Sequence, residues 1–387
     1  MEEGRSASPN TAGYCKARKR LPLSDLEKLH GQTLQKIQAS ADQEETWRGR
    51  RVKVVDGSGL SMPDTKENQE AYPQSKTQKP GCGFPVMRIV VVFSLATGAI
   101  LDLAKGALSV AERTLFRSLW SLFEPDDVIL ADCGFCSYAD FYFLAQQNID
   151  CVMGNHHRRK VGLELVEQFC QGDRLIYWLK MRPCPKWLDK KDWQAVPDKL
   201  LIREITFSLD IPGFRTKKVA LATTLLDPLN FPKQAFAQLY RRRWMAELFL
   251  RDIKTSMGMD ILRCKTPDMI HKELLMNIIA YNLIRTIMLQ AAQKHHLSPS
   301  RISFKGTMGT IRQWAPLIAA RRLDQIKQRE MKEALLTYLA RDRIPNRPNR
   351  NEPRARKRRP KNYQLLNKPR HTFKEIPHRN KYNKTLS

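Results

Sequence analysis

The sequence predicts an α/β fold, in which a mixed β-sheet is flanked by helices. Short apolar segments at residues 52–56 and 128–132 are typical of buried strands. A segment with helical spacing lies between them at residues 111–123, so strands and helices alternate. Two much longer helical segments follow, over residues 232–257 and 268–293, and they are long enough to cover a sheet.

The N-terminal segment, residues 1–50, is polar and is predicted to contain one helix from about Ser24 to Ala39. Ser24 suits the N-cap position, because a serine hydroxyl can accept a hydrogen bond from a backbone N–H of the first turn.

Residues 51–154 are predicted to form the first part of a core. The expected elements, in order, are strands at 52–56, 87–95 and 100–103, a helix at 111–123, a strand at 128–132, a helix at 138–147 and a strand at 151–153. The stretch Gly57-Ser58-Gly59 after the first strand predicts a turn.

The alternation of strands and helices stops at residues 155–225, which predict a mainly β insertion. Its expected strands, at 175–181, 200–209 and 218–225, are joined by proline-rich turns. Trp178, Trp187 and Trp193 lie in this insertion. Their spacing singles none of them out for a special role, and core packing is the interpretation favoured for each.

Residues 226–295 hold the two long helices that complete the core, and residues 296–340 are predicted to be helical as well. Thr266-Pro267-Asp268 is a good helix start, with Thr at the N-cap and Pro at the first helical position. Residues 341–387 contain 16 Lys and Arg against 3 Asp and Glu, and predict a basic, disordered tail that can still bind phosphates.

The charge balance points to a polyanionic partner. The chain of 387 residues carries 67 Lys and Arg against 39 Asp and Glu, a formal net charge of +28. Nucleic acid is the usual partner of such a protein, because each neutralised phosphate releases condensed counterions. A membrane surface is the competing polyanion, but no basic amphipathic helix supports it. We therefore expect DNA as partner and no membrane.

The N-terminus lacks the basic start and apolar core of a secretion signal, and the most apolar run, at residues 88–102, is too short to cross a bilayer. Eight cysteines scattered through a chain of this size do not indicate a disulfide framework. We expect a cytoplasmic protein.

One helix carries a narrow polar stripe that suggests a site. Tyr240, Arg243, Glu247 and Lys254 fall within about 60° of one another around an ideal helix. Mostly apolar residues surround this stripe, which indicates a largely buried helix that faces something polar. The alternative for Glu247 alone is an ordinary i,i+4 pair with Arg251, worth a few tenths of a kcal/mol.

Two aspartates add to this stripe. Asp56 and Asp132 each end an apolar strand, and residues just past the carboxyl ends of parallel strands point into the functional crevice of a sheet. With Glu247 they supply the hard oxygen ligands that Mg²⁺ or Mn²⁺ prefers, and two such ions can serve phosphoryl transfer. Taken alone, either aspartate could equally be a turn or helix cap.

The spacing Tyr240-x2-Arg243-x3-Glu247-x6-Lys254 resembles the Y-R-E-K signature of bacterial insertion-sequence DDE transposases. The stretches that begin at Asp56 and Asp132 resemble the two aspartate regions of that family, in the same order. The similarity covers roughly residues 50–295. It implies a ribonuclease-H-like core with Asp56, Asp132 and Glu247 as catalytic and metal-binding carboxylates, two Mg²⁺ (or Mn²⁺) ions, and phosphate contacts from Tyr240, Arg243 and Lys254.

The resemblance further implies cleavage at transposon ends through a hairpin intermediate, strand transfer into target DNA, and a homodimer in the synaptic complex. A related branch stacks an aromatic side chain of the insertion on a flipped base. Only 55 residues precede Asp56, whereas relatives carry a longer N-terminal region, which suggests a truncated or helper-dependent copy. Two alternatives remain: a remnant that only binds DNA, and a ribonuclease-H-like nuclease without strand transfer.

Overall fold

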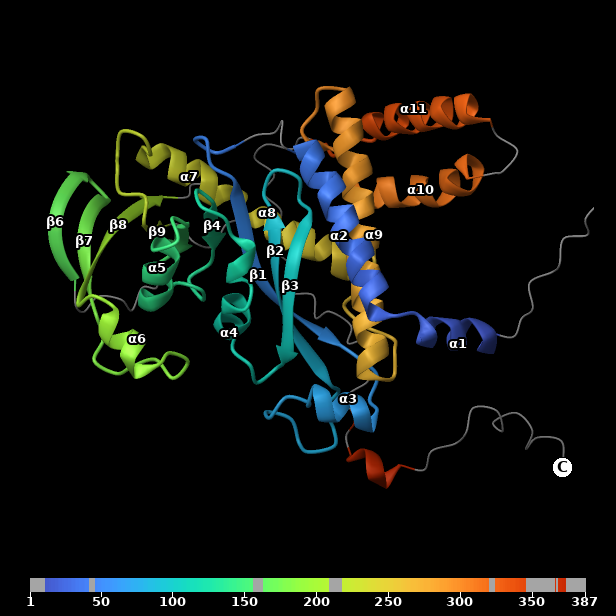
Figure 1. The fold of residues 1–387 in the computed structure, drawn as a ribbon, viewed down its shortest axis with the longest axis horizontal. Helices are drawn as coiled ribbons and strands as arrows, with labels where there is room; N and C mark the ends of the chain where they lie inside the picture. The colour runs from blue at the N-terminus through green and yellow to red at the C-terminus, as the bar shows by residue number, and fades with distance from the viewer. Residues whose placement is uncertain are drawn as a thin grey trace, which may run out of the picture.

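The computed structural model describes residues 11–41, 46–155, 163–208, 218–319, 324–345, 366 and 368–373. Within these residues the chain forms one large mixed sheet with helices on both of its faces (Figure 1). The predicted α/β class with a mixed sheet and flanking helices is confirmed.

The sheet has nine strands in the described part of the chain, in the order β3-β2-β1-β4-β5-β9-β8-β7-β6. Their bounds are β1 (Val52–Ser61), β2 (Val86–Ser94), β3 (Ile100–Ala107), β4 (Val128–Ala131), β5 (Asp150–Gly154), β6 (Leu163–Cys170), β7 (Asp173–Leu179), β8 (Lys199–Ser208) and β9 (Lys218–Thr223). The pairs β1–β4 and β4–β5 are parallel, and the others are antiparallel. The β-rich insertion therefore extends the sheet of the core through the β5–β9 pair.

The predicted turn at Gly57-Ser58-Gly59 is wrong, because β1 continues through it to Ser61. Pairing with β2 persists over this whole stretch, as far as Ser61 opposite Val86. At Gly57 a Cβ atom would lie 2.6 Å from the carboxyl carbon of Glu112, so a larger residue there would require the end of this partly exposed side chain to move. The glycine thus marks a close approach between a strand and a neighbouring side chain.

The remaining strand predictions are correct to within a few residues, but the insertion also contains two elements that were not predicted. These are the edge strand β6 and helix α6 (Lys190–Ala195). β6 pairs only with β7, and its Leu165 and Val166 are exposed. Because its outward side chains include Glu164 and Glu167, the strand lacks the continuous apolar pattern of its neighbours.

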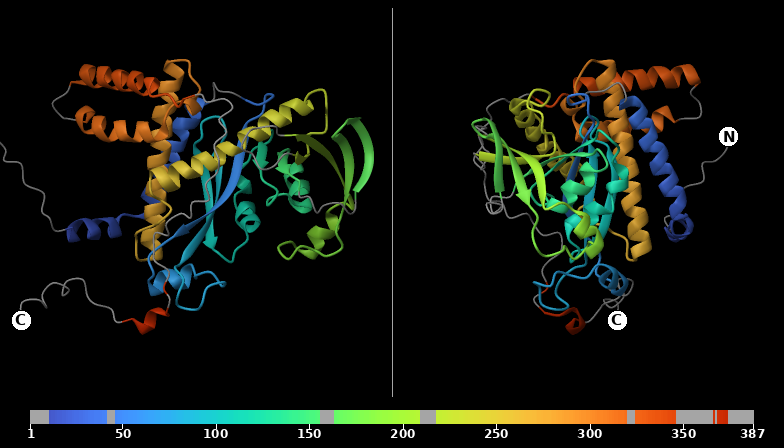
Figure 2. Two further views of the ribbon diagram at one scale, coloured as in Figure 1. Left: turned by 180° about the vertical axis from the view of Figure 1, so that it is seen from behind. Right: turned by 60° about the vertical axis from the view of Figure 1, so that its left-hand side comes forward.

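Side chains alternate along β1 between two hydrophobic cores. Val54 packs in the core shared with α7 (Lys233–Arg242), α8 (Trp244–Arg251) and α9 (Pro267–Lys294). Val55 packs in the core on the other face, against α4 (Glu112–Arg117) and α5 (Tyr138–Ala145). In the view from behind, the yellow α7 and α8 cross in front of the sheet (Figure 2).

The predicted helix at 111–123 is shorter than expected, since α4 ends at Arg117 and a 3₁₀ turn, η1 (Trp120–Leu122), follows. The predicted single helix at 232–257 is three segments: α7, α8 and a π-helical turn, η2 (Asp252–Ser256). Around Arg243 the backbone hydrogen bonds join residues three apart in place of four: Arg243 N–H donates to Tyr240 O, and Ala246 N–H donates to Arg243 O. At η2 they widen, because Met257 N–H donates to Asp252 O.

Helix α9 is the central core helix. It begins at the predicted position, although the Thr266 side chain makes no capping hydrogen bond. Among the described residues it is the one helix whose length and composition would allow it to cross a membrane, yet 56% of its most apolar window is buried inside the protein. The predicted N-terminal helix is present as α2 (Leu23–Ala41), which runs alongside α9, and α1 (Ala12–Arg20) precedes it (Figure 1).

The C-terminal region is helical, as predicted, with α10 (Phe304–Ile318) and α11 (Gln325–Arg341). Three short segments complete the described elements: α3 (Lys66–Ala71), η3 (Pro299–Arg301) and η4 (Arg370–Thr372). Most of the predicted disordered tail, at 346–365, 367 and 374–387, lies outside the described residues.

Candidate active site

Asp56 and Asp132 lie side by side on neighbouring parallel strands. The register pairs Val54 of β1 with Leu130 of β4. Asp56 follows Val54 by two residues, and Asp132 follows Leu130 by two residues, so the two aspartates occupy equivalent positions. Both side chains therefore project on the face that also carries Val54, toward α7 and α8. The Gly57 N–H donates to Asp56 Oδ1 at 2.8 Å, and the Gly134 N–H donates to Asp132 Oδ1 at 2.8 Å.

Asp56 has a strongly altered proton affinity. The pKa of Asp56 is raised to about 6, chiefly by burial and to a smaller extent by the negative charges of Asp132 and Glu247. The Gly57 hydrogen bond and the positive charge of Arg243 act in the opposite direction without cancelling the rise. The three carboxylates predicted from the sequence are therefore close enough to influence one another electrostatically.

Glu247 lies on α8, whose buried face is formed by Ala246, Phe249 and Leu250. Its side chain remains 40% exposed and accepts a hydrogen bond from Arg243 Nη2 at 3.2 Å. The predicted alternative, in which Glu247 pairs with Arg251, is not what the structure shows; Arg251 lies beside Asp252. The i,i+4 partner of Glu247 lies on the N-terminal side, within the same polar stripe.

Arg243 is the central cation of the site. Burial alone lowers the pKa of Arg243, but Tyr240, Asp56, Glu247 and Asp132 surround the guanidinium and raise the pKa overall. One guanidinium thus stands among all three carboxylates. A planar guanidinium in this position is also the group best suited to bind a phosphate through two hydrogen bonds.

Tyr240 packs into the same cluster, with the Arg243 guanidinium 5.7 Å from its ring centroid. Burial raises the pKa of the Tyr240 phenol, and the charges of Asp132 and Cys133 contribute to the rise. A Cβ atom at Gly154 would lie 2.9 Å from the Tyr240 hydroxyl and 3.1 Å from the Cys133 nitrogen. Gly154, at the end of β5, is thus packed closely against the site, and no motif in the sequence marks it.

Lys254 occupies a different place from the other signature residues. It lies on the η2 turn and its Nζ donates to Ser58 Oγ at 2.8 Å and to the Gly59 carbonyl at 3.1 Å. Ser58 follows Asp56 by two residues on β1, so Lys254 docks beside the carboxylates on the same face of the strand. Ser58 was not predicted as part of the site, because the glycines around it were interpreted as a turn.

A buried ion pair fixes the η2 turn. Asp252 Oδ2 accepts from Arg285 Nη2 of α9 at 3.1 Å, and Arg285 Nε donates to the Tyr281 hydroxyl at 2.9 Å. The Tyr281 hydroxyl in turn donates to the Gly98 carbonyl at 2.8 Å. The pair thereby links the turn that carries Lys254 to the central helix and to the β2–β3 connection.

The donor set of the site consists of hard carboxylate oxygens, which suit a divalent cation such as Mg²⁺ or Mn²⁺. The raised pKa of Asp56 reflects chiefly the burial of its carboxyl group, and a bound cation would stabilise the charged form. Among the described residues, however, no three His, Cys, Asp or Glu side chains are gathered closely enough to hold a metal ion. Arg243 holds Glu247, so coordination by all three carboxylates requires that this pair separate.

Comparison with known proteins supports a common family. Residues 47–283 match the family model described as Transposase DDE domain. The chain is 26% identical over 359 residues to the transposase InsG for insertion sequence element IS4 of Escherichia coli (strain K12), covering 90% of this chain and 76% of that protein. It is 28% identical over 117 residues to the putative transposase InsZ of the same organism, covering 30% and 39%.

Two solved structures resemble the chain weakly. One is a piggyBac transposase synaptic complex with hairpin DNA, at 10% identity and a TM-score of 0.39, of which this chain spans 57%. The other is Ciona intestinalis endonuclease V in complex with DNA, at 10% identity and a TM-score of 0.22. The two alignments cover 73% and 68% of this chain.

Proposed function

The chain belongs to the DDE transposase family, and on this premise we propose that Asp56, Asp132 and Glu247 are the carboxylates with which it cleaves and joins DNA. The protein is a DNA transposase, a metal-dependent enzyme of DNA phosphoryl transfer. Family membership does not favour the two alternatives, a DNA-binding remnant or a nuclease without strand transfer. The electrostatic coupling of the three carboxylates around Arg243 is the observation that carries the assignment.

The proposed core is ribonuclease-H-like. The order β3-β2-β1-β4-β5, with three antiparallel strands followed by two parallel ones, supports it. In this proposal residues 51–154 and 226–295 form the catalytic core, residues 155–225 form the insertion, and the N-terminal residues 1–50 and C-terminal residues 296–340 are accessory regions.

We propose that Asp56, Asp132 and Glu247 hold two Mg²⁺ or Mn²⁺ ions. Such ions, when bound, activate the attacking oxygen and stabilise the leaving oxygen of the phosphate. With Glu247 engaged as a metal ligand, Arg243 would be available to bind the DNA phosphate, and the Tyr240 ring beside it would restrain its side chain. Lys254 meets the same strand of DNA as a point charge beside Ser58.

The proposed assembly is a homodimer that binds two transposon ends and then target DNA. The protein is proposed to act in the bacterial cytoplasm on the nucleoid. The net charge of +28 supports both the DNA partner and a strongly salt-dependent affinity.

Three single substitutions test the catalytic proposal. Asp56→Asn, Asp132→Asn and Glu247→Gln are each expected to abolish Mg²⁺-dependent cleavage and strand transfer on a duplex that carries the element's own end. DNA affinity, measured by fluorescence anisotropy, should persist, because none of the three removes a positive charge. Asp192→Asn, an exposed carboxylate on α6, is the matched control and should cleave normally. Wild-type cleavage by any of the three variants would exclude that residue from the catalytic set.

A further inference from the structure

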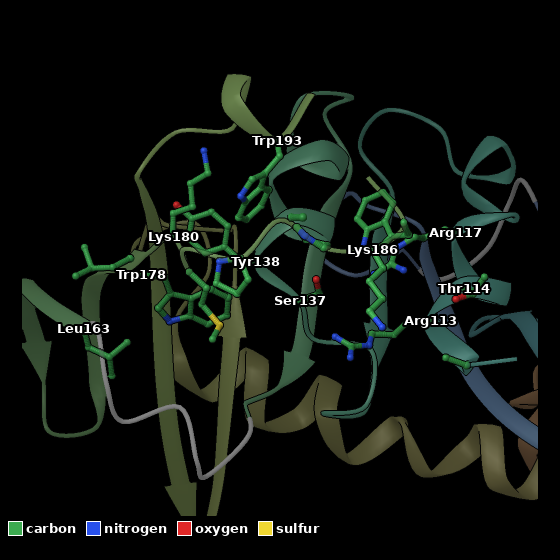
Figure 3. Close-up of a pocket in the computed structure, with 17 residues that line it drawn as sticks. Arg113, Thr114, Arg117, Ser137, Tyr138, Leu163, Trp178, Lys180, Lys186 and Trp193 are labelled. Atoms are coloured by element: carbon green, nitrogen blue, oxygen red, sulfur yellow. The ribbon is translucent and has the colours of Figure 1, made fainter. Parts of the chain in front are cut away.

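A cavity of about 980 Å³ lies on the face of the sheet opposite the three carboxylates. It is enclosed by α4, the start of α5, β7 and α6. Its buried wall belongs to the core that contains Val55, on the face of the sheet opposite to Val54. Its lining is rich in aromatic rings, namely those of Tyr138, Trp178, Trp187 and Trp193. Figure 3 shows Tyr138, Trp178 and Trp193 together at one end of the cavity.

The charged side chains around the cavity are all positive. Arg113, Arg117, Lys180 and Lys186 line it, and the described lining residues include no Asp or Glu. Arg113 and Lys186 are exposed, and Figure 3 shows them close together on the side of Ser137 away from Trp193. An occupant should therefore be flat and apolar in part, and negatively charged where it meets the rim.

The aromatic wall is already held in place. Arg117 binds the Asp140 carboxylate through Nε at 2.9 Å and Nη2 at 3.1 Å. This fixed guanidinium lies 3.8 Å from the Trp187 ring centroid, yet the Trp187 side chain remains 37% exposed. Lys180 is fixed similarly, with Nζ donating to the Val196 carbonyl at 2.5 Å and lying 4.7 Å from the Trp193 ring. Because these rings are already ordered, little conformational entropy is lost when a second ring stacks on them.

We propose that this cavity binds unpaired nucleotides of single-stranded DNA, as a second DNA site separate from the catalytic centre. Among the aromatic lining residues Trp187 is exposed, whereas Tyr138, Trp178 and Trp193 are buried and form the apolar wall behind it. An exposed aromatic ring flanked by cations is a common means of binding single strands, because every base offers a face for stacking. A duplex hides these faces, so the cavity discriminates for unpaired DNA. The proposal rests on DNA being the substrate of this transposase.

Other occupants fit less well. The chain's own C-terminal segment is strongly basic and would be repelled by the cationic rim. A base flipped out beside the three carboxylates would lie on the other face of the sheet and could not reach this cavity. An acidic, aromatic peptide of another protein shares part of the chemistry but lacks the repeated phosphates that suit a row of cations.

Two measurements on the full chain test the site. Fluorescein-labelled (dT)12 should bind more tightly than the same length of duplex in anisotropy titrations at fixed salt. An oligonucleotide that carries 5-iodouracil should, on irradiation, crosslink to the peptide that contains Trp187. Trp187→Ala is expected to weaken (dT)12 binding about tenfold, whereas Trp187→Phe retains most of it. The double variant Arg113→Ala/Lys186→Ala should weaken binding and flatten its salt dependence, without touching the packed core.

The controls separate this site from the catalytic one. Tyr14→Ala and Lys305→Ala remove an exposed ring on α1 and an exposed cation on α10 and should leave (dT)12 affinity unchanged. Asp56→Asn should still bind (dT)12, and Trp187→Phe should still cleave duplex ends. Unchanged affinity in both the Trp187→Ala and the double variant, or crosslinks confined to α7 and α8, would overturn the proposal. Displacement of (dT)12 by a Glu-Trp repeat peptide at lower concentration would overturn it in favour of an acidic protein partner.

Discussion

At the scale of single residues, the site depends on charges that are held close together against their repulsion. Asp56 is mostly buried and stands near two other carboxylates, which is unfavourable for the folded protein unless a cation is bound. Residues of this kind commonly lower stability while they serve function. The same reasoning gives a measurable relation between Asp56, pH and stability.

Asp56→Asn is expected to stabilise the metal-free protein at neutral pH. The folded pKa of about 6 lies above the ordinary 3.8, so protonated Asp56 is favoured in the fold. Its stabilising contribution is complete below pH 3.8 and is lost as pH rises through 6, a change on the order of 3 kcal/mol. Urea unfolding of wild type and variant should therefore coincide near pH 4 and diverge by pH 7.

Added Mg²⁺ or Mn²⁺ should raise the melting temperature of the wild type and should raise that of Asp56→Asn much less. Asp192→Asn serves as the reference, because removing an exposed carboxylate should not change the pH dependence. Equal pH profiles of wild type and Asp56→Asn would contradict the crowding of charge at this position.

Gly154→Ala is expected to impair the site by steric conflict. The new Cβ would lie 2.9 Å from the Tyr240 hydroxyl, so the ring must move and the Arg243 it restrains must move with it. Affinity for transposon ends should fall about tenfold, with a loss of stability of roughly 1–2 kcal/mol. Tyr240→Phe removes the conflicting oxygen, so the double variant Gly154→Ala/Tyr240→Phe should bind better than Gly154→Ala alone.

At the scale of elements, the sequence predicted the existence of most helices and strands because their apolar spacing is regular. It could not predict that the helix of Glu247 is interrupted twice. The interruption at η2 follows from a contact between Asp252 and Arg285, which are 33 positions apart and meet only after α9 has packed.

Arg285→Met is expected to destabilise the protein by about 3 kcal/mol, because it removes the buried cation of Asp252 and leaves that carboxylate with the exposed Arg251, at 3.7 Å, as its neighbouring cation. Burial already raises the pKa of Asp252, which the charge of Arg285 lowers. Cleavage should fall beyond what reduced stability explains, since the η2 turn carries Lys254. The double variant Arg285→Met/Asp252→Leu removes both charges of the pair. Compared with Arg285→Met alone, it should regain more of the free energy of unfolding, measured with urea, than of the cleavage rate, measured at the same temperature.

Arg117→Met breaks a comparable buried pair with Asp140 on the other face of the sheet. It is the matched control, and should lower stability to a similar degree while leaving duplex cleavage per folded molecule unchanged. A similar loss of cleavage in both variants would show that the Asp252–Arg285 pair has no particular role in positioning the active site.

At the scale of the whole molecule, the prediction that Asp56 ends its strand is wrong, because β1 continues to Ser61, whereas Asp132 directly follows β4. The register nevertheless brings the two aspartates to neighbouring positions. The periodicity of apolar residues determines which face a side chain occupies, and Asp56 and Asp132 were placed correctly for that reason. It does not determine distances between elements. The position of Arg243 among three carboxylates, the contact of Lys254 with Ser58 and the need for Gly154 all arise from strand register and packing.

Deletion of residues 346–387 is expected to weaken DNA binding without regard to sequence. This segment holds most of the 16 Lys and Arg found after residue 340, and each phosphate contact releases counterions. The slope of log affinity against log salt should become shallower by several units, while the preference for transposon ends over random duplex persists. Anisotropy titrations between about 50 and 200 mM salt measure both quantities.

The continuous sheet ends at β6, whose outer row of backbone N–H and C=O groups has no partner strand in the described part of the chain. Such an edge is a template on which another polypeptide can add a strand. The exposed apolar side chains of Leu165 and Val166 favour that addition. Glu164 and Glu167 oppose it by repulsion between copies. The insertion that widens the transposase core therefore also sets its solubility, and overproduction without DNA exposes the protein to edge-to-edge aggregation.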